Sequence, residues 1–240
     1  MIRLHCGAVI ILKYMSQLFI VSTPIGNLKD ITFRALEALK DSSFIACEDT
    51  RVTGILLNHY EIKKELVSLN AVNEKSKTSY IVERIKNGET CSLVSDAGTP
   101  GISDPGVRLI SEAIKNEIDI IPVPGPSAMV AALTISGLPT DTFLFEGFIP
   151  QKKGRQTKLK QLAAEERTII LYESTYRIEK LLNELKEYMP GRQIVVCREL
   201  TKKFEEVWRG TPEELIESFS ERITKGEFVV VIAPKDWIRF

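Results

Sequence analysis

The chain has 240 residues with 32 basic and 32 acidic side chains, so its formal net charge is zero. This balance excludes a protein that coats nucleic acid through an overall positive charge. Apolar residues make up 44% of the chain, which excludes intrinsic disorder and is enough for one large domain or two small ones. Because no apolar run approaches the roughly 20 residues that cross a bilayer, we expect a soluble protein.

The sequence predicts no metal site. The cysteines show no Cys-x-x-Cys spacing, and only two histidines accompany them: Cys6, Cys47, Cys91, Cys197, His5 and His59. Scattered thiols suit a reducing compartment, so we expect a cytoplasmic protein in which Cys47, Cys91 and Cys197 are small core residues of buried strands.

Residues 1–15 are expected to form an N-terminal extension, with Met15 as a candidate for the natural start. Arg3, a short apolar run and Lys13 weakly resemble a signal peptide. However, the run is shorter than the roughly 7–15 residues of a signal-peptide core, and no small-residue cleavage site follows it.

From Leu18 onward, short β-branched runs alternate with longer amphipathic runs, which predicts β–α units around a mostly parallel sheet. The expected strands cover residues 18–22, 44–48, 91–95 and 119–122. The expected helices between them cover residues 32–40, 74–87 and 127–137.

A cluster of turn residues from Gly137 to Asp141 interrupts this pattern, so we place a domain boundary there. In the second half of the chain, the residue pattern predicts strands at 142–148, 168–172, 194–199, 205–209 and 228–232. It predicts helices near 155–166, 175–188 and 212–223. The short polar link between 199 and 205 predicts an antiparallel hairpin. The fold class is therefore α/β, with a mainly parallel sheet in domain 16–137 and a mixed sheet in domain 138–240.

Several common catalytic motifs are missing. The sequence has no G-x-G-x-x-G after its first strand, no phosphate-binding G-x-x-x-x-G-K-[ST], no G-x-S-x-G and no H-E-x-x-H. These absences argue against a dinucleotide enzyme, a nucleoside-triphosphatase, a serine hydrolase and a zinc protease.

Four loops follow expected strands, at the edge where open α/β sheets bind ligands. They comprise residues 23–28, 48–51, 95–106 and 122–128. The first could be an ordinary strand-to-helix turn, the second a helix N-cap through Asp49 or Thr50, and the fourth a rigid linker. The third contains three Gly, two Pro and two Asp, and so long a loop in a compact domain indicates a function.

These four loops, in this order, resemble a known family. Together with residues 137–141, 145–150, 172–174 and 198–202, they are similar to the bacterial small-subunit ribosomal RNA cytidine 2′-O-methyltransferases. That family belongs to the tetrapyrrole methylase superfamily, the class III S-adenosylmethionine methyltransferases. The resemblance extends from Leu18 to Ile232.

The resemblance implies a homodimeric, two-domain enzyme that transfers a methyl group from S-adenosylmethionine to a ribose hydroxyl of ribosomal RNA. It also implies that the cofactor lies folded in a cleft between the two domains. The positions that match the family's cofactor loops are Pro24, Ile25, Asp96, Thr99, Ser127, Ala128, Tyr172, Leu200 and Ala233.

Methyl transfer needs an aligned acceptor oxygen and an acceptor for its proton, but no covalent enzyme intermediate. Asp49, Asp104 and Glu173 are candidates for the base or for an orienting group, and Arg51 is a candidate to hold an acid or a phosphate. The residues alone do not rank them.

Contact with RNA requires local positive charge. A basic run follows Phe148-Ile149-Pro150 and consists of Lys152, Lys153, Arg155, Lys158 and Lys160. It predicts a phosphate-binding segment, and the alternative is a solvated helix face.

The sequence departs from the family pattern where histidines are common. It has Val52 after Glu-Asp-Thr-Arg, Thr175-Tyr176 after Tyr-Glu-Ser, and no histidine in residues 68–74. Two alternatives therefore stay open: a methyltransferase acting on a small molecule such as a tetrapyrrole, and a non-catalytic RNA-binding or ribosome-assembly protein.

Overall fold

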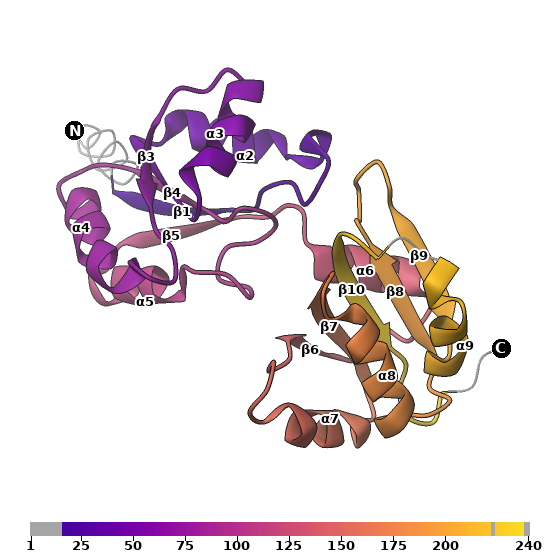
Figure 1. Ribbon diagram of the computed structural model, residues 1–240. Helices are drawn as coiled ribbons and strands as arrows, with labels where there is room; N and C mark the ends of the chain where they lie inside the picture. Colours follow the sequence, from indigo (N-terminus) through magenta and orange to yellow (C-terminus); the bar gives the residue numbers. More distant parts are fainter. Residues whose placement is uncertain (1–15, 222–223, 238–240) are drawn as a thin grey trace, which may run out of the picture. The chain divides into compact units, whose positions relative to one another are not determined.

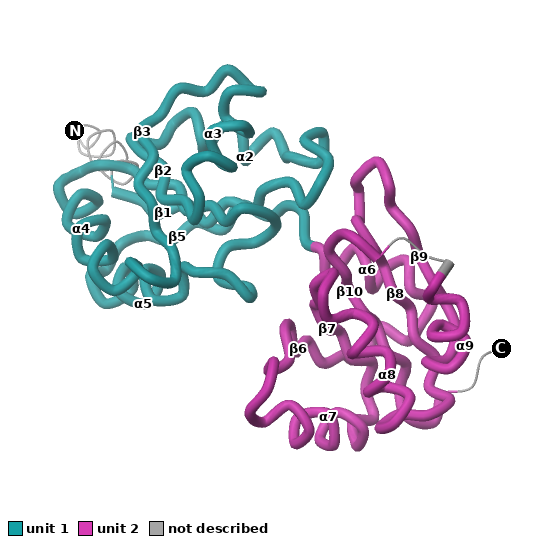
Figure 2. Tube along the Cα trace, in the orientation of Figure 1, with its two compact units in different colours: residues 1–127 teal, residues 128–240 magenta. Residues whose placement is uncertain are grey.

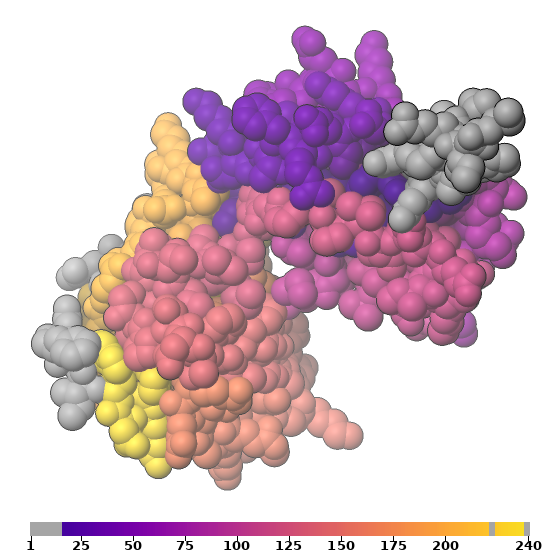
Figure 3. All heavy atoms as spheres, turned by 180° about the vertical axis from the view of Figure 1, so that it is seen from behind, coloured from indigo at the N-terminus to yellow at the C-terminus, as the bar shows by residue number. Residues whose placement is uncertain are grey.

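The computed structural model describes residues 16–221 and 224–237 (Figure 1), so the expected N-terminal extension lies outside the described residues. The chain divides into two compact units, residues 1–127 and 128–240 (Figure 2). Side chains fill the space between the ribbons of each unit (Figure 3). None of the helices in the described ranges is long and apolar enough to cross a membrane.

The boundary between the units differs from the expected one at residues 137–138. Helix α6 (Ala128–Ser136) packs against strand β10 (Glu227–Ile232) and therefore belongs to the second unit. The turn residues 137–141 connect α6 to the next strand within that unit. Glycine and proline in this cluster mark the end of a helix, which sequence alone does not distinguish from the end of a domain.

The first unit is built on a parallel five-stranded sheet in the order β3-β2-β4-β1-β5. Its strands are β1 (Gln17–Val21), β2 (Phe44–Cys47), β3 (Glu65–Ser68), β4 (Cys91–Val94) and β5 (Asp119–Val123). Its helices are η1 (Leu28–Asp30), α2 (Phe33–Asp41), α3 (Thr50–His59), α4 (Glu74–Lys86) and α5 (Val107–Lys115).

Helices cover both faces of this sheet, which explains its apolar central strands. Phe44 and Ala46 in β2 face the core formed with α4 and α5, whereas Ile45 and Cys47 face the core formed with α2 and α3. Such two-sided burial is typical of parallel sheets. It also places Cys47 and Cys91 in the interior of the unit as expected.

The second unit contains a mixed five-stranded sheet in the order β6-β7-β10-β8-β9. Its strands besides β10 are β6 (Phe143–Phe148), β7 (Thr168–Ser174), β8 (Ile194–Arg198) and β9 (Glu206–Gly210). Strands β6 and β7 run parallel, while β7, β10, β8 and β9 are successively antiparallel. The expected β8–β9 hairpin and the expected α/β class are thus confirmed.

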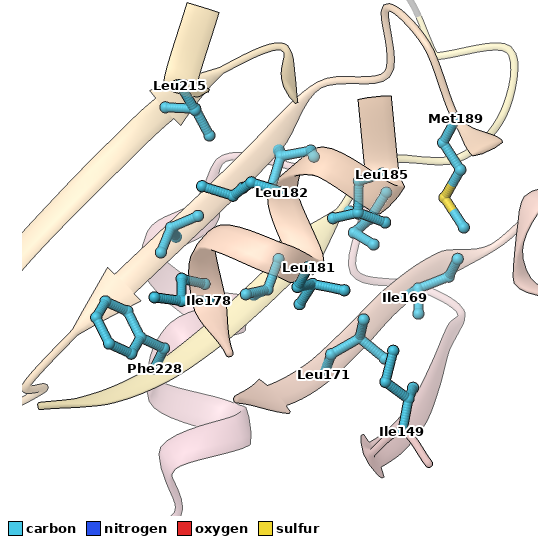
Figure 4. Close-up of a cluster of buried hydrophobic side chains, with 14 of the residues drawn as sticks. Ile149, Ile169, Leu171, Ile178, Leu181, Leu182, Leu185, Met189, Leu215 and Phe228 are labelled. Atoms are coloured by element: carbon cyan, nitrogen blue, oxygen red, sulfur yellow. The ribbon is translucent and has the colours of Figure 1, made fainter. Parts of the chain in front are cut away.

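Helices α7 (Arg155–Ala163), α8 (Ile178–Tyr188) and α9 (Pro212–Glu217) cover one face of this sheet. Ile178, Leu181, Leu182 and Leu185 recur at helical spacing on α8. They share one core with Ile169 and Leu171 of β7 and with Leu215 of α9 (Figure 4). Helix α9 ends at Glu217, short of the expected 223, and is followed by the 3-10 turn η2 (Phe219–Glu221).

Replacing Leu181 by Ala should lower the free energy of unfolding by about 2–5 kcal/mol, because the side chain is fully buried in the α8 core. Urea unfolding measures this loss. Lys186→Ala, on the exposed side of the same helix, should change the free energy by no more than about 0.5 kcal/mol. Equal losses in the two variants would show that α8 does not anchor this core.

Candidate functional site

All five strands of the first unit end at the same edge of its sheet, because they are parallel. The four loops singled out in the sequence therefore meet at this edge, which we call the carboxyl edge. Ligands of open α/β sheets bind at such an edge. The loops contact one another through main-chain and side-chain hydrogen bonds.

A two-residue bridge joins the first loop to the third. The Thr23 amide donates to the Gly98 carbonyl at 2.8 Å, and the Gly98 amide donates to the Thr23 carbonyl at 3.0 Å. The Thr23 hydroxyl adds a bond to the carbonyl of Ser95 at 3.1 Å. The buried Pro24 and Ile25 follow directly, so the bridge fixes two of the expected cofactor residues.

The fourth loop is attached through Thr99 and Gly125. The Thr99 hydroxyl lies 3.0 Å from the Ser22 hydroxyl and donates to the Pro126 carbonyl at 3.4 Å. A Cβ atom at Gly125 would lie 3.0 Å from Ser22 Cβ and 3.3 Å from the Ser22 carbonyl oxygen. Glycine avoids these tight contacts, and the close approach brings the chain leading to Ser127 beside the end of strand β1.

Four carboxylates gather at the same edge: Glu48, Asp49, Asp96 and Asp104. Asp96 accepts a hydrogen bond from the Asp49 amide at 3.0 Å. Asp49 caps helix α3 by accepting from the Arg51 amide at 2.8 Å, and its carboxylate also pairs with the Arg51 guanidinium. The helix-cap alternative for this loop is therefore correct.

The electrostatic states of these carboxylates differ. Hydrogen bonds from Arg51 lower the pKa of Asp49 to about 2. Burial raises the pKa of Asp96, and burial together with Asp96 raises the pKa of Asp104. Burial, then Asp104 and Asp96, raise the pKa of Glu48. The edge therefore combines one strongly acidic, partly exposed carboxylate with three that hold their protons more tightly than usual.

A small pocket of about 130 Å³ lies between the first loop and helix α3. Its lining is mostly apolar, with polar groups on one side, and consists of Thr23, Pro24, Leu28, Val52, Thr53, Ile55, Leu56, Ser95 and Asp96. Val52, which stands where the resemblance expects a histidine, supplies an apolar wall. An acidic group beside apolar walls is a common arrangement in small-molecule sites.

The chemistry of this edge fits S-adenosylmethionine, the cofactor that the resemblance implies. That molecule carries a sulfonium, an ammonium and a carboxylate group, so it is a cation overall, and it has no phosphate. The four loops contain no lysine, and Arg51 is already paired with Asp49. Carboxylates and main-chain groups are therefore available for a cationic ligand without phosphate.

In the second unit, Tyr172 joins strand β7 to the start of helix α6. Its hydroxyl accepts a hydrogen bond from the Met129 amide at 3.1 Å, next to Ala128. Leu200 follows the end of β8, where Arg198 pairs with Phe228 at the start of β10. Tyr172 pairs with Val229, one residue further along β10. Ala128, Tyr172 and Leu200 thus belong to one end of the second sheet.

The structure does not bring Ala233 together with these residues. It follows the opposite end of β10, about 13 Å along the strand from the partner of Tyr172 at a rise of roughly 3.3 Å per residue. Ala233 is fully buried, and its amide donates to the Gln193 carbonyl. Because β10 runs antiparallel to β7 and β8, the residue after its end lies at the opposite end of the sheet from Tyr172 and Leu200. Ala233 is therefore no longer a cofactor candidate.

The structure also contradicts the expected roles of Arg155 in RNA binding and of Glu173 as a base. Arg155 is 3% exposed, and its guanidinium holds the Glu184 carboxylate in a fork at 2.6–2.9 Å. The Glu173 side chain has no exposed surface, and its Oε1 pairs with Arg177 at 2.7 Å. A buried guanidinium cannot contact RNA, and a buried, paired carboxylate cannot take a proton from a bound hydroxyl.

The remaining lysines of the basic run lie at the surface. Lys152, Lys153 and Lys160 are exposed, whereas Lys158 is partly buried and pairs with Glu146 at 2.8 Å. Their contact with RNA stays a prediction.

Two residues of the site were not selected from the sequence. The sequence pattern places Glu48 in the second loop without a role of its own, although its position at the end of a buried strand is a usable signal. Glu74, at the start of α4, accepts from the amides of Gly106 and Arg108 at 3.0 and 3.2 Å and so fixes the end of the third loop. No local pattern revealed this contact, because it joins segments more than 30 residues apart.

Comparison with known proteins gives a consistent result. The model of the family described as Tetrapyrrole (Corrin/Porphyrin) Methylases matches residues 17–216. Two relatives are named Ribosomal RNA small subunit methyltransferase I. The one from Synechocystis sp. is 48% identical over 91% of this chain and 79% of its own length. The one from Thermotoga maritima is 44% identical over 92% of this chain and 100% of its own length. The fold is also similar to uroporphyrin-III C-methyltransferase from Thermus thermophilus complexed with S-adenyl homocysteine (TM-score 0.63, 15% identity, 90% and 96% covered).

Replacing Glu48 by Gln should raise the free energy of unfolding at neutral pH, because burial and the neighbouring aspartates disfavour the charged form. The raised pKa means that this penalty is absent below the ordinary pKa of glutamate and complete above the raised value. The gain should therefore vanish as the pH falls below about 4. Urea unfolding between neutral and acid pH measures it, with the exposed Glu37→Gln as control. A gain that persists in acid would contradict the electrostatic cause.

Proposed function

Because this chain belongs to the tetrapyrrole methylase family, we propose that it transfers a methyl group from S-adenosylmethionine to the 2′-hydroxyl of a cytidine in small-subunit ribosomal RNA. The observation that carries the proposal is the identity of 44–48% to proteins named Ribosomal RNA small subunit methyltransferase I, over about nine-tenths of this chain. We further propose that it acts in the cytoplasm, as a homodimer, on the RNA of the small ribosomal subunit.

S-adenosylmethionine, when bound, supplies an electrophilic methyl group on a positively charged sulfur. We propose that the carboxyl edge binds it through Pro24, Ile25, Asp96, Thr99 and Ser127. Ala128, Tyr172 and Leu200 are the candidates in the second unit. Carboxylates near the edge favour the cationic donor, and the apolar residues exclude water from it.

The main contribution of the chain is to hold the reactants in line. The bridge between Thr23 and Gly98 and the contacts of Thr99 fix the loops before any ligand binds. Fixed orientation of reacting groups can contribute about 7–11 kcal/mol to lowering a barrier.

Asp104 is the best candidate for the proton acceptor. Its pKa is raised by burial, which brings it closer to the range where a general base is effective. The pKa of Asp49, at about 2, makes that carboxylate a weak base, and its bonds to Arg51 give it a positioning role.

The function is tested by transfer of labelled methyl from S-adenosylmethionine to small ribosomal subunits that lack the modification. Wild type should label a ribose 2′-oxygen. Asp96→Ala should weaken cofactor binding about 10- to 150-fold, the effect of losing a hydrogen bond to a charged group. Cofactor binding without transfer to subunits would indicate a different acceptor, and no cofactor binding would indicate a non-catalytic protein.

The base assignment predicts that Asp104→Asn lowers kcat about 10²- to 10⁴-fold and leaves cofactor affinity near the wild-type value. The acid limb of the kcat–pH profile should disappear, because the titrating carboxyl is gone. Single-turnover kinetics across the pH range measures both effects. Asp49→Asn should retain that limb, and its loss in this variant instead would transfer the role of base to Asp49.

A further inference from the structure

Arg177 is held in a fixed orientation by a buried ion cluster. Its Nε lies 2.7 Å from Glu173 Oε1 and donates to the Ser174 hydroxyl at 3.1 Å. Among the described residues, both polar contacts of the Arg177 side chain use Nε. The Arg177 side chain is 21% exposed, and its two Nη groups, which can bind phosphate oxygens in pairs, make none of these contacts.

The cluster behind Arg177 consists of a second arginine and two carboxylates, with a lysine at its exposed side. Arg155 lies 3.8 Å from the second oxygen of Glu173 and pairs with Glu184, which Lys180 also approaches at 3.9 Å. The two arginines therefore balance the two carboxylates, and the third cation, Lys180, has a side chain that is 59% exposed to solvent.

Phe148 presents an exposed aromatic ring beside this guanidinium. It ends strand β6, is 52% exposed, and its ring centre lies 5.8 Å from the guanidinium carbon of Arg177. The ring also meets Tyr172 edge-on at 5.6 Å between centres. The guanidinium lies over one face of the ring, so the exposed part of the ring is the surface available for stacking.

A β-bulge gives Phe148 this position. Phe145 and Phe148 are three residues apart, so a regular strand would point them to opposite faces of the sheet. The register shifts between Phe145 and Gly147, and Gly147 has φ of +67°, which favours glycine. As a result both rings contact Tyr172. Bulges that redirect a side chain are common beside functional sites.

We propose that Phe148 and Arg177 form a binding site for one nucleotide of single-stranded RNA. The base stacks on the Phe148 ring, and the Nη groups of Arg177 hold a neighbouring phosphate. The exposed Lys152 and Lys153, in the loop after Phe148, and the 95% exposed Tyr176 extend this basic and aromatic surface along the chain. The proposal rests on the RNA substrate of the proposed function and adds where on the second unit that RNA binds.

The test measures binding of a short fluorescein-labelled oligocytidylate over a range of salt concentrations. Phe148→Ala should weaken binding about 5- to 150-fold, the effect of losing one stacked base, without changing the slope of log affinity against log salt. Phe143→Ala removes another exposed phenylalanine of the same strand and is the matched control. It should bind like wild type.

Loss of Arg177 should act on the salt dependence instead. Arg177→Gln should make the slope shallower by about 0.7, because one phosphate contact is lost. This variant leaves the buried Glu173 without its closest cation. The double variant Glu173→Gln/Arg177→Gln removes one charge of each sign and tests the same effect without leaving that carboxylate unpaired. Arg167→Gln, an exposed arginine paired with Glu165, is the control.

Cofactor affinity and methyl transfer to unmodified small subunits separate the outcomes. With Phe148→Ala, KM for subunits should rise while affinity for S-adenosylmethionine stays unchanged. Weaker cofactor binding with unchanged RNA binding would assign Phe148 to the cofactor and overturn the proposal. If wild type transfers the methyl group while the Phe148→Ala and Arg177→Gln variants bind RNA normally, this binding site is wrong and the proposed function stands. Absence of transfer and of RNA binding in wild type would overturn both proposals.

Discussion

The pair of main-chain hydrogen bonds between Thr23 and Gly98 is the contact on which the carboxyl edge depends. Parallel strands bring their following loops to one side of a sheet, but the sheet does not fix the shape of those loops. The bridge ties the loop after β1 to the loop after β4, and Thr99 then reaches Ser22 and Pro126. Asp96, on the same loop, reaches the Asp49 amide. Segments that are far apart in sequence thereby become one rigid surface.

This surface is electrostatically costly. Glu48, Asp96 and Asp104 have raised pKa values because burial, and then repulsion by neighbouring aspartates, oppose ionisation. Arg51 compensates Asp49, but it is exposed and lies at the outer side of the cluster. A fold selected for stability alone would not keep three poorly compensated carboxylates together. The arrangement is understandable where the ligand is itself a cation, because ligand and site then relieve each other's charge.

The sequence predicts this edge better than it predicts the elements around it. Strands β2 and β4 are recognisable because every residue in them is buried, which gives continuous apolar runs. Strand β3 has the same length as β2 and β4, but the sequence does not predict it because only Val67 is buried and Glu65 is exposed. Helix α3 was missed because Asp49 and Arg51 at its start looked like loop residues and Gly54 interrupts its apolar pattern. Helix α5 begins directly after Gly106, the last residue of the long loop. The sequence does not predict this helix because the glycines and prolines before it indicate a loop.

The basic run shows where residue type and residue spacing give different answers. Composition alone assigned five cations to the surface. Arg155, however, shares its helix face with Leu159 and Leu162, at spacings of four and seven residues, and both leucines are fully or almost fully buried. Its position therefore directs the side chain inward, where only a carboxylate such as Glu184 can compensate it. Arg177 lies at the start of α8, outside the run, and is the arginine of this cluster whose Nη groups carry no described contact. Helical spacing was the available signal for Arg155, whereas the position of Arg177 depends on a tertiary contact with Glu173 that no local pattern contains.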